Sequence, residues 1–496
     1  MDPVAGAPPD AGSDPRGDRR DGGDPAGTIA AIATAVAPGQ GSVAIVRLSG
    51  PAAEAIGRRL FRAPGCQAWE SHRVLYGHVV DPASGERVDE ALLLLMRAPR
   101  SFTREDVVEL HCHGGLVVVR RVLELVLAAG ARLAGPGEFS QRAFLNGRLD
   151  LTRAEALMEM VAARSRRAAQ LAMAGLDGGL QRRISALRER LLDQLAELEA
   201  RVDFEDDLPP LDADAVRAEL EAVGGELAAM LAEAQQGQLL REGLRVAIVG
   251  RPNVGKSSLL NRLSRRERAI VTELPGTTRD LLETELVLEG VPLTLLDTAG
   301  IRPTSDPVER LGIARSLEAL ASADAVLLLF DLAVGWTAAD QELLQRVPAG
   351  VPLLRVGNKA DCLATAPGLA TAAGLATAAG LAATAGEAGA APPPADLAIS
   401  ALQGEGLEAL GRLLLQRCGA GEAQAITVAL NARQRELAAA AALALGRTGE
   451  AAAAGLPWDF WTIDLRDAVR QLGAICGEEI SEAVLERIFS RFCIGK

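Results

Sequence analysis

The 496-residue chain has few cysteines, no long hydrophobic run and a deficit of positive charge. Its six cysteines are scattered without paired spacing, which predicts neither a disulfide framework nor a zinc site and leaves them as reduced thiols. No apolar stretch approaches the roughly 20 residues that span a bilayer. Residues 1–26 lack the apolar segment of a signal peptide. We therefore expect a cytoplasmic protein with no membrane segment.

The formal net charge of −13 argues against broad electrostatic adhesion to nucleic acid, because phosphate neutralisation needs clustered Lys and Arg. Any contact with RNA must be local. The basic clusters at 164–167 and 262–266 are best explained as solvated helix faces. The hydrophobic content of 49% is ample for packed cores, and the length allows about three or four domains.

A phosphate-binding loop is the clearest motif in the chain. Gly250-Arg-Pro-Asn-Val-Gly255-Lys-Ser-Ser258 follows the apolar run 246–249, where a strand should turn into a helix. Backbone N–H groups and the helix N-terminus would hold phosphate oxygens, Lys256 would reach the terminal phosphates, and Ser257 would bind Mg²⁺. The residues predicted to bind nucleotide in this loop are Asn253, Val254, Gly255, Lys256, Ser257 and Ser258.

Two further segments favour GTP as the nucleotide. Asp297-Thr-Ala-Gly300 ends an apolar run, which places a carboxylate for the Mg²⁺ shell and a backbone amide for the γ-phosphate. Asn358-Lys-Ala-Asp361 follows another apolar run, and its carboxylate can accept both the N1 and N2 hydrogens of guanine, which adenine does not supply. Outside the loop, the predicted GTP-binding residues are Thr272, Thr277, Thr278, Asp297, Thr298, Ala299, Gly300, Asn358, Lys359, Asp361, Ser400 and Ala401.

Two of these groups have specific expected roles. Ser400-Ala401 would close the base site from a later loop. Thr277-Thr278 belongs to a mobile segment, and the Thr278 hydroxyl would complete the Mg²⁺ shell beside Ser257 when γ-phosphate is present.

The hydrophobic patterning predicts several domains. Residues 1–26 are rich in Pro, Gly, Asp and Arg and should be disordered. Residues 27–146 alternate strand-like runs with a helix at 115–129, which indicates an α+β domain. Thr152-x-x-Glu155 is a capping box that should open a long helical region.

The nucleotide-binding part interrupts that helical region. We expect a Ras-like P-loop α/β domain at 244–418, inserted into one helical domain formed by 147–243 and 419–496. Residues 363–394 repeat Gly-Leu-Ala-Thr-Ala-Ala and are a low-complexity insertion in a surface connection, to which no function is assigned.

The flanking segments carry motifs that a generic GTPase would not share. They resemble the MnmE (TrmE) family of bacterial tRNA modification GTPases over nearly the whole ordered chain. The matching segments are Thr28-Ile-Ala-Ala-Ile-Ala-Thr34, Ser101-Phe-Thr-Arg-Glu-Asp-Val-Val-Glu109, His113-Gly-Gly115, Pro136-Gly-Glu-Phe-Ser-Gln-Arg-Ala-Phe-Leu-Asn146 and Phe492-Cys-Ile-Gly-Lys496.

The resemblance implies a homodimer that acts with the flavoprotein MnmG, which brings the FAD, to add an aminomethyl-type group to C5 of the wobble uridine of tRNA. The N-terminal domain would be the dimerising domain and would bind 5-formyl- or methylene-tetrahydrofolate as the carbon donor. By motif position Arg47, Glu109 and Arg148 match the folate-binding residues. Arg148 stands where the family often has lysine, which keeps the charge but changes the donor geometry.

The residues alone would not have singled out this set. Arg47 ends an apolar strand, where a solvated strand end is the simpler interpretation, and Glu109 alternates with Val108 and Leu110, so it should point away from the core. A carboxylate nevertheless suits the amide and amino hydrogens of a pterin, and an arginine suits the carboxylates of folate.

The resemblance also supplies the hydrolytic machinery. No glutamine follows Asp-Thr-Ala-Gly, and Glu309 occupies the water-orienting position of the family, with Lys256 on the phosphates. Asn253, Thr272, Leu274 and Thr277 match the positions that surround a K⁺ ion. K⁺-stimulated hydrolysis coupled to dimerisation of the GTPase domains follows as an expectation.

Three other features bear on function. Cys493 lies in a terminus expected to fray and remain reachable, and the family likeness favours a functional thiol over a small buried hydrophobe. A metal site at His111-Cys112-His113 is disfavoured because adjacent strand residues point to opposite faces. Trp458 and Trp461 are expected to pack between helices.

Two alternative functions stay open. A metabolic folate enzyme with a regulatory GTPase would turn over folate without tRNA, and a GTPase switch would act in the assembly of a ribosomal or other RNA particle. The switch role would need a dedicated RNA-binding module, and the sequence shows no Gly-x-x-Gly motif in a basic setting.

Overall fold

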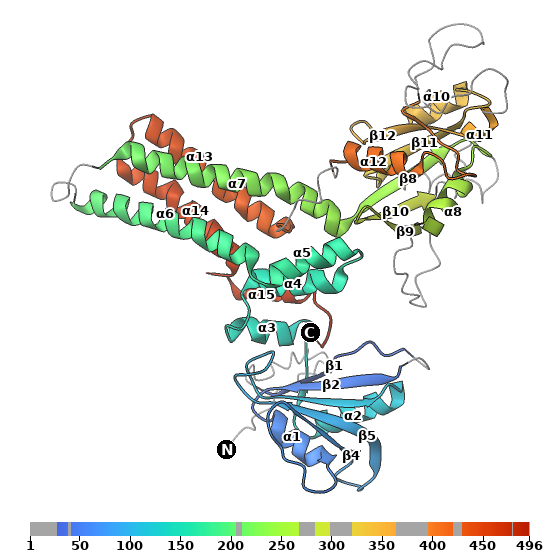
Figure 1. The fold of residues 1–496 in the computed structure, drawn as a ribbon. Helices are drawn as coiled ribbons and strands as arrows, with labels where there is room; N and C mark the ends of the chain where they lie inside the picture. Colours follow the sequence, from blue (N-terminus) through green and yellow to red (C-terminus); the bar gives the residue numbers. More distant parts are fainter. Residues whose placement is uncertain are drawn as a thin grey trace, which may run out of the picture. The chain divides into compact units, whose positions relative to one another are not determined.

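The computed structural model describes residues 27–37, 41–204, 211–266, 283–297, 320–363, 395–419, 429–478 and 480–495. These residues form two compact units (Figure 1). The first unit contains the chain up to Leu149 together with the residues from Ser481 onward, and the second contains Asp150–Ile480. No helix among the described residues combines the length and the apolar character that crossing a membrane requires.

A seven-stranded sheet is the centre of the first unit. Its order is β3-β4-β5-β6-β2-β1-β7, and all neighbours are antiparallel except β1 and β7. The strands are β1 (Ile29–Ile32), β2 (Val43–Ser49), β3 (Phe61–Arg62), β4 (Arg73–Val80), β5 (Arg87–Met96), β6 (Val107–His113) and β7 (Arg132–Leu133).

The two faces of this sheet bury different side chains. Val108 and Leu110 of β6 lie in a cluster with residues of α1 (Ala53–Leu60) and α2 (Leu116–Ala128). Glu109 between them points to the opposite face, as strand alternation requires. On that opposite face Ile29 and Ala31 pack with Phe139 of α3 (Glu138–Leu145).

The C-terminal residues belong to this first unit. Helix α15 (Glu482–Phe489) packs beside α3, and the Phe489 ring contacts those of Phe144 and Phe492. The structure groups these C-terminal residues with the N-terminal part, whereas the prediction assigned them to the helical domain. The physical reason is that α15 buries Leu485 and Phe489 against α3 of the N-terminal part.

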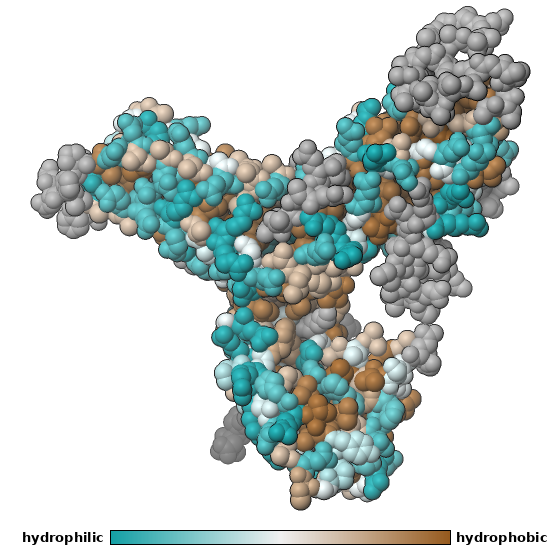
Figure 2. Space-filling model, in the orientation of Figure 1, coloured by the Kyte–Doolittle hydropathy of each residue, from teal (hydrophilic) through white to brown (hydrophobic). Residues whose placement is uncertain are grey.

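The second unit contains a bundle of four long helices. These are α6 (Gly179–Phe204), α7 (Ala213–Glu242), α13 (Ala432–Ala453) and α14 (Trp458–Cys476), joined by the shorter α4 (Leu151–Ala162) and α5 (Arg166–Leu176). The four long helices share one buried cluster, so segments before and after the nucleotide-binding part pack together. Trp461 lies in this cluster and packs edge-to-face on Trp458, as predicted. The face of the bundle seen in Figure 2 is mainly hydrophilic, because the apolar side chains point inward.

The start of α4 differs from the predicted capping box. Asp150 is the N-cap, and its side chain accepts from the backbone N–H of Arg153 and from the hydroxyl of Thr152. Glu155 instead pairs with Arg433 of α13 at 2.7 Å. The box was wrong because a carboxylate two residues earlier is the better acceptor for the first turn.

The rest of the second unit is a six-stranded sheet in the order β13-β12-β11-β8-β10-β9, with only β9 antiparallel to its neighbour. Both faces are buried: Val246 and Ile248 of β8 belong to one cluster, and Ala247 and Val249 to another. The strands are β8 (Leu244–Gly250), β9 (Glu283–Leu288), β10 (Val291–Asp297), β11 (Ala325–Asp331), β12 (Leu353–Asn358) and β13 (Leu397–Ala398), with helices α8 (Lys256–Arg266), α10 (Ala338–Gln345), α11 (Ala360–Leu363) and α12 (Leu407–Arg417).

Candidate functional site

The phosphate-binding loop lies between β8 and α8, at the carboxyl edge of the parallel strands, where α/β sheets bind ligands. Asn253 and Gly255 both have positive φ, 64° and 99°. A Cβ atom on Gly255 would lie 2.2 Å from Nδ2 of Asn358. Glycine is therefore required at 255 by both backbone conformation and close packing.

Two backbone carbonyls of this loop hold the Lys256 side chain over it. Its Nζ donates to the carbonyl oxygens of Gly250 at 2.8 Å and Arg251 at 3.1 Å. Val254 is buried, whereas Asn253, Ser257 and Ser258 are exposed at the start of α8. The ammonium group and two hydroxyls thus lie at a helix N-terminus, which is a favourable place for phosphate.

Asn358 connects the phosphate-binding loop to the segment predicted to close the base site. Its side chain is buried, its Nδ2 donates to the Val254 carbonyl at 2.7 Å, and its Oδ1 accepts from the Ala401 N–H at 3.0 Å. Ser400 Oγ donates to Oδ1 of Asp361 at 2.6 Å. The structure therefore brings together three of the five segments that the sequence assigned to the nucleotide.

Asp331 is part of this edge and was not predicted. It ends β11, and its Oδ2 contacts Nζ of Lys359 at 2.7 Å. Burial raises the pKa of Asp331, but the hydrogen bonds from Lys359 and the Ala333 N–H, together with the positive charge of Lys359, outweigh burial and hold the pKa below its usual value. Its position after the apolar run 325–330 was the signal that could have identified it, since strand ends meet at this edge.

Several predicted residues cannot be placed. The side chain of Asp297, the last residue of β10, is not described. The predicted residues outside the described part of the chain are Thr272, Leu274, Thr277, Thr278, Thr298, Ala299, Gly300 and Glu309.

A second candidate site lies on the first unit, on the sheet face away from α1 and α2. Arg47 and Glu109 are direct partners across β2 and β6, and Arg47 Nε lies 2.8 Å from Glu109 Oε1. His111 Nε2 lies 3.1 Å from the other oxygen, Oε2. Burial raises the pKa of Glu109, while the hydrogen bond from His111 and the charge of Arg47 together lower it below its usual value.

This geometry corrects the interpretation of Arg47 as a solvated strand end. Arg47 lies inside β2, with its guanidinium 5.7 Å from the centre of the Phe139 ring. Its Nη1 also donates to the Gly495 carbonyl at 3.2 Å. The cross-strand carboxylate and the returning C-terminus keep it half-buried.

The C-terminal segment is attached rather than frayed, contrary to expectation. The Gly137 N–H donates to the Cys493 carbonyl at 3.3 Å, and Pro136 and Ile494 form an isolated β-bridge. The Cys493 thiol is nevertheless exposed. These backbone contacts hold the thiol on the same unit as Arg47.

Arg148 lies near the other aromatic residue of this face. Its Nη1 donates to the Ser101 carbonyl at 2.9 Å, and its guanidinium lies 5.7 Å from the centre of the Phe102 ring. Phe102 packs against the cluster that contains Phe139. The three residues named by the resemblance are therefore linked through Phe139 and Phe102.

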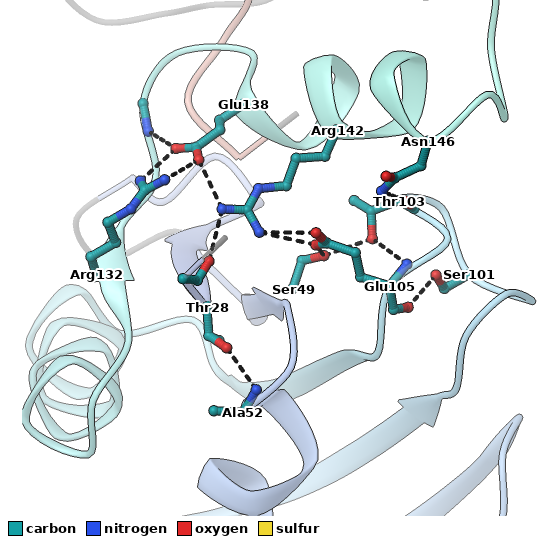
Figure 3. Close-up of polar contacts among 12 residues, drawn as sticks. Thr28, Ser49, Ala52, Ser101, Thr103, Glu105, Arg132, Glu138, Arg142 and Asn146 are labelled. Atoms are coloured by element: carbon teal, nitrogen blue, oxygen red, sulfur yellow. Dashed lines mark hydrogen bonds and ion pairs between the residues drawn. The ribbon is translucent and has the colours of Figure 1, made fainter. Parts of the chain in front are cut away.

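A buried ionic network supports this face and was missed at the sequence level (Figure 3). Arg142 of α3 is 5% exposed and contacts Glu105 and Glu138, each at 3.1 Å. Glu138 also pairs with Arg132, and Glu105 accepts from the Ser49 hydroxyl at 2.7 Å. The network fixes α3 against the loop 101–106. Arg142 lies on a helix that also carries Glu138, Ser140 and Gln141, so no local sequence pattern marked it as buried.

The adjacent histidines and cysteine have separate partners. His113 Nδ1 lies 2.7 Å from Asp89, and His111 contacts Glu109. Burial raises the pKa of the Cys112 thiol to about 12. In the residues that the structure describes, no group of three His, Cys, Asp or Glu side chains could hold a metal ion.

Comparisons with known proteins identify relatives of this chain. Residues 28–148 match the GTP-binding protein TrmE N-terminus, and residues 151–493 match the MnmE helical domain. The tRNA modification GTPase MnmE of Synechococcus sp. (strain CC9605) is 65% identical over 470 residues, which are 95% of this chain and 99% of that protein. The MnmE of Synechococcus sp. (strain RCC307) is 67% identical over 95% of this chain and 98% of that protein.

Among solved structures, Aquifex aeolicus Era bound to GDP and AlF₄⁻ is 28% identical, with a TM-score of 0.27, and covers 40% of this chain and 66% of that one. The assignment of the nucleotide-binding fold rests on the strand order and loop geometry given above. The chain carries a phosphate-binding loop packed against the Asn358–Asp361 segment. Its relatives are 65% and 67% identical to it over nearly its full length. The chain belongs to the MnmE family of tRNA modification GTPases.

Proposed function

We propose that this GTPase takes part in modification of C5 of the wobble uridine of tRNA, as a homodimer with an MnmG-type flavoprotein and a tetrahydrofolate carbon donor. The observation that carries the proposal is the Arg47–Glu109 pair, with the C-terminal segment bonded to Arg47 through the Gly495 carbonyl. This places an exposed thiol, Cys493, on the unit that offers groups suited to a folate.

The Arg47–Glu109 surface offers complementary chemistry for a pterin. The carboxylate of Glu109 accepts hydrogen bonds and is kept ionised by Arg47 and His111. A pterin presents adjacent amide and amino N–H groups, and such a carboxylate can accept hydrogen bonds from both. The fully buried Phe139 ring packs beneath the Arg47 guanidinium and supports this surface.

Mg²⁺ and K⁺ suit the residues of the phosphate-binding loop that the structure describes. Ser257 offers an exposed hydroxyl oxygen, which Mg²⁺ prefers as a ligand. Asn253 offers an exposed amide side chain on a loop residue with positive φ. Bound K⁺ would supply positive charge beside the β,γ-bridge of GTP, and Lys256 would position the phosphates.

Mass spectrometry of wobble uridine tests the proposal. The chain and its Cys493→Ser variant are expressed in a bacterium that lacks its own MnmE. Restored C5 modification by the intact chain alone is expected. If neither restores it, although both are folded, hydrolyse GTP and bind the host MnmG, a role as a switch in RNA-particle assembly becomes the better explanation.

The ion requirement has its own measurement. We expect GTP turnover to be faster in K⁺ than in Na⁺ at equal ionic strength, and to rise with protein concentration as GTPase domains dimerise. The Asn253→Ala variant should lose the preference for K⁺. The Glu309→Ala variant should bind GTP and lose most of its turnover. Equal rates of the intact chain in both salts would remove K⁺ from the mechanism.

A further inference from the structure

Arg104 has a backbone conformation that arginine rarely adopts. Its φ is 59°, in the left-handed region that favours glycine. Its side chain is exposed, and Nη1 donates to the Asn146 carbonyl at 2.9 Å. Asn146 in turn donates from Nδ2 to the Thr103 carbonyl at 2.6 Å (Figure 3). These two bonds hold the loop 101–105 against the end of α3. Conformations of this kind often occur at ligand-binding positions.

A second arginine, Arg148, bonds to the same loop. Arg104 Nη1 lies 3.4 Å from the position of a Cβ on Gly147, and Arg148 follows directly in the chain. Arg148 is fixed by its contacts with the Ser101 carbonyl and the Phe102 ring. Neither arginine forms an ion pair with a carboxylate in the part of the chain that the structure describes. Both retain N–H donors for an anion.

The surface from Glu109 to Arg104 changes its chemistry in three steps. Glu109, with Arg47 and His111, forms a polar end. The half-buried Phe102 forms an apolar middle, and it packs on the cluster that contains the fully buried Phe139. Arg148 and Arg104 form a basic end. A folate has the same order of groups: a pterin with hydrogen-bond donors, an aromatic benzoyl ring, and a glutamyl tail with carboxylates.

We propose that Arg104, together with Arg148, binds the carboxylates of the glutamyl tail of the folate. The inference rests on the proposed folate function and adds a residue and a ligand group to it. Arg104 belongs to the loop 101–105 and Arg148 bonds to it, and guanidinium groups match carboxylates through paired, charge-assisted hydrogen bonds. Without such a ligand, the only partner of the Arg104 guanidinium that the structure records is the Asn146 carbonyl.

Calorimetric titration with two ligands tests this role. One ligand is 5-formyl-tetrahydrofolate, and the other is 5-formyl-tetrahydropteroate, which lacks the glutamate. The variant is Arg104→Gly, which suits the positive φ and should fold at least as well as the intact chain. We expect the Kd of this variant for the folate to rise about fivefold, because a partly exposed charged contact is lost. Its Kd for the pteroate should stay unchanged.

The control is Arg120→Ala, an exposed arginine on α2, which covers the other sheet face. It should change neither Kd. An equal change for both ligands in Arg104→Gly, or no change for the folate, would show that Arg104 has only a structural role and would overturn the inference. Failure of the intact chain to bind either ligand would overturn the folate site itself, and this inference with it.

Discussion

Asn358 is the residue whose side chain connects the phosphate-binding loop to the base site. Replacing it with alanine leaves the Val254 carbonyl and the Ala401 N–H without their partners in a buried place. We expect Asn358→Ala to lower the free energy of unfolding by about 2 kcal/mol and to weaken GTP binding at least tenfold. Thermal unfolding and nucleotide titration measure both. Gln345→Ala, an exposed amide on α10, is the matched control; an equal effect there would contradict the role of Asn358.

Glu109 makes the first unit sensitive to acid. Its pKa in the folded chain is lower than the 4.5 of a free glutamate, so the unfolded state binds the proton first as the pH falls. The stabilising contribution is complete above pH 4.5 and is lost as the pH falls through the folded pKa. We expect Glu109→Gln to have a lower Tm near pH 7 and a smaller loss of Tm on acidification. The control is Glu124→Gln, an exposed residue of α2, which should keep the acid sensitivity of the intact chain. If Glu109→Gln also keeps that acid sensitivity, Glu109 is not its source.

At the scale of elements, α15 attaches the C-terminal segment to the first unit. Phe489 is 1% exposed and contacts the rings of Phe144 and Phe492. Phe489→Ala should lower the free energy of unfolding by about 3 kcal/mol, because the packing of its ring is lost. It should also release residues 493–495. Hydrogen exchange should then become faster at the Gly137 amide, which bonds to the Cys493 carbonyl. Phe460→Ala, an exposed aromatic on α14, should leave that amide protected. Unchanged exchange in Phe489→Ala would mean that other contacts hold the terminus.

How far the sequence predicted these elements depends on the separation of the partners. The phosphate-binding loop and the strands around 43–49 and 107–113 were predictable, because local spacing and hydrophobic patterning determine them. The pairing of Arg47 with Glu109 was not, because the two residues are 62 positions apart and only the strand register brings them together. The attachment of α15 to α3 depends on apolar contacts over more than three hundred residues, and its helical pattern alone suited the bundle equally well.

At the scale of the whole molecule, the nucleotide-binding part leaves and re-enters the helical bundle at adjacent points. Arg241, near the end of α7, donates to the carbonyls of Ala429 and Leu430, and its Nη1 contacts Glu159 of α4 at 2.9 Å. A Cβ on Gly237 would lie 2.3 Å from Cβ of Ala429. The two chain ends that flank the insertion are therefore held beside each other by residues of the bundle itself.

This proximity predicts that the bundle does not need the insertion. A chain in which residues 244–428 are replaced by a short Gly-Ser linker should keep its helical content and unfold cooperatively, because α6, α7, α13 and α14 retain their common buried cluster. It should hydrolyse no GTP. Circular dichroism during thermal unfolding measures the first outcome. A second variant that ends at residue 430 loses α13 and α14 but keeps the phosphate-binding loop, and its α6 and α7 should melt, since their buried faces then meet water. If the excised chain also loses its helices, the nucleotide-binding sheet contributes to the fold of the bundle through Leu171 and Leu240, which lie in the sheet's buried cluster.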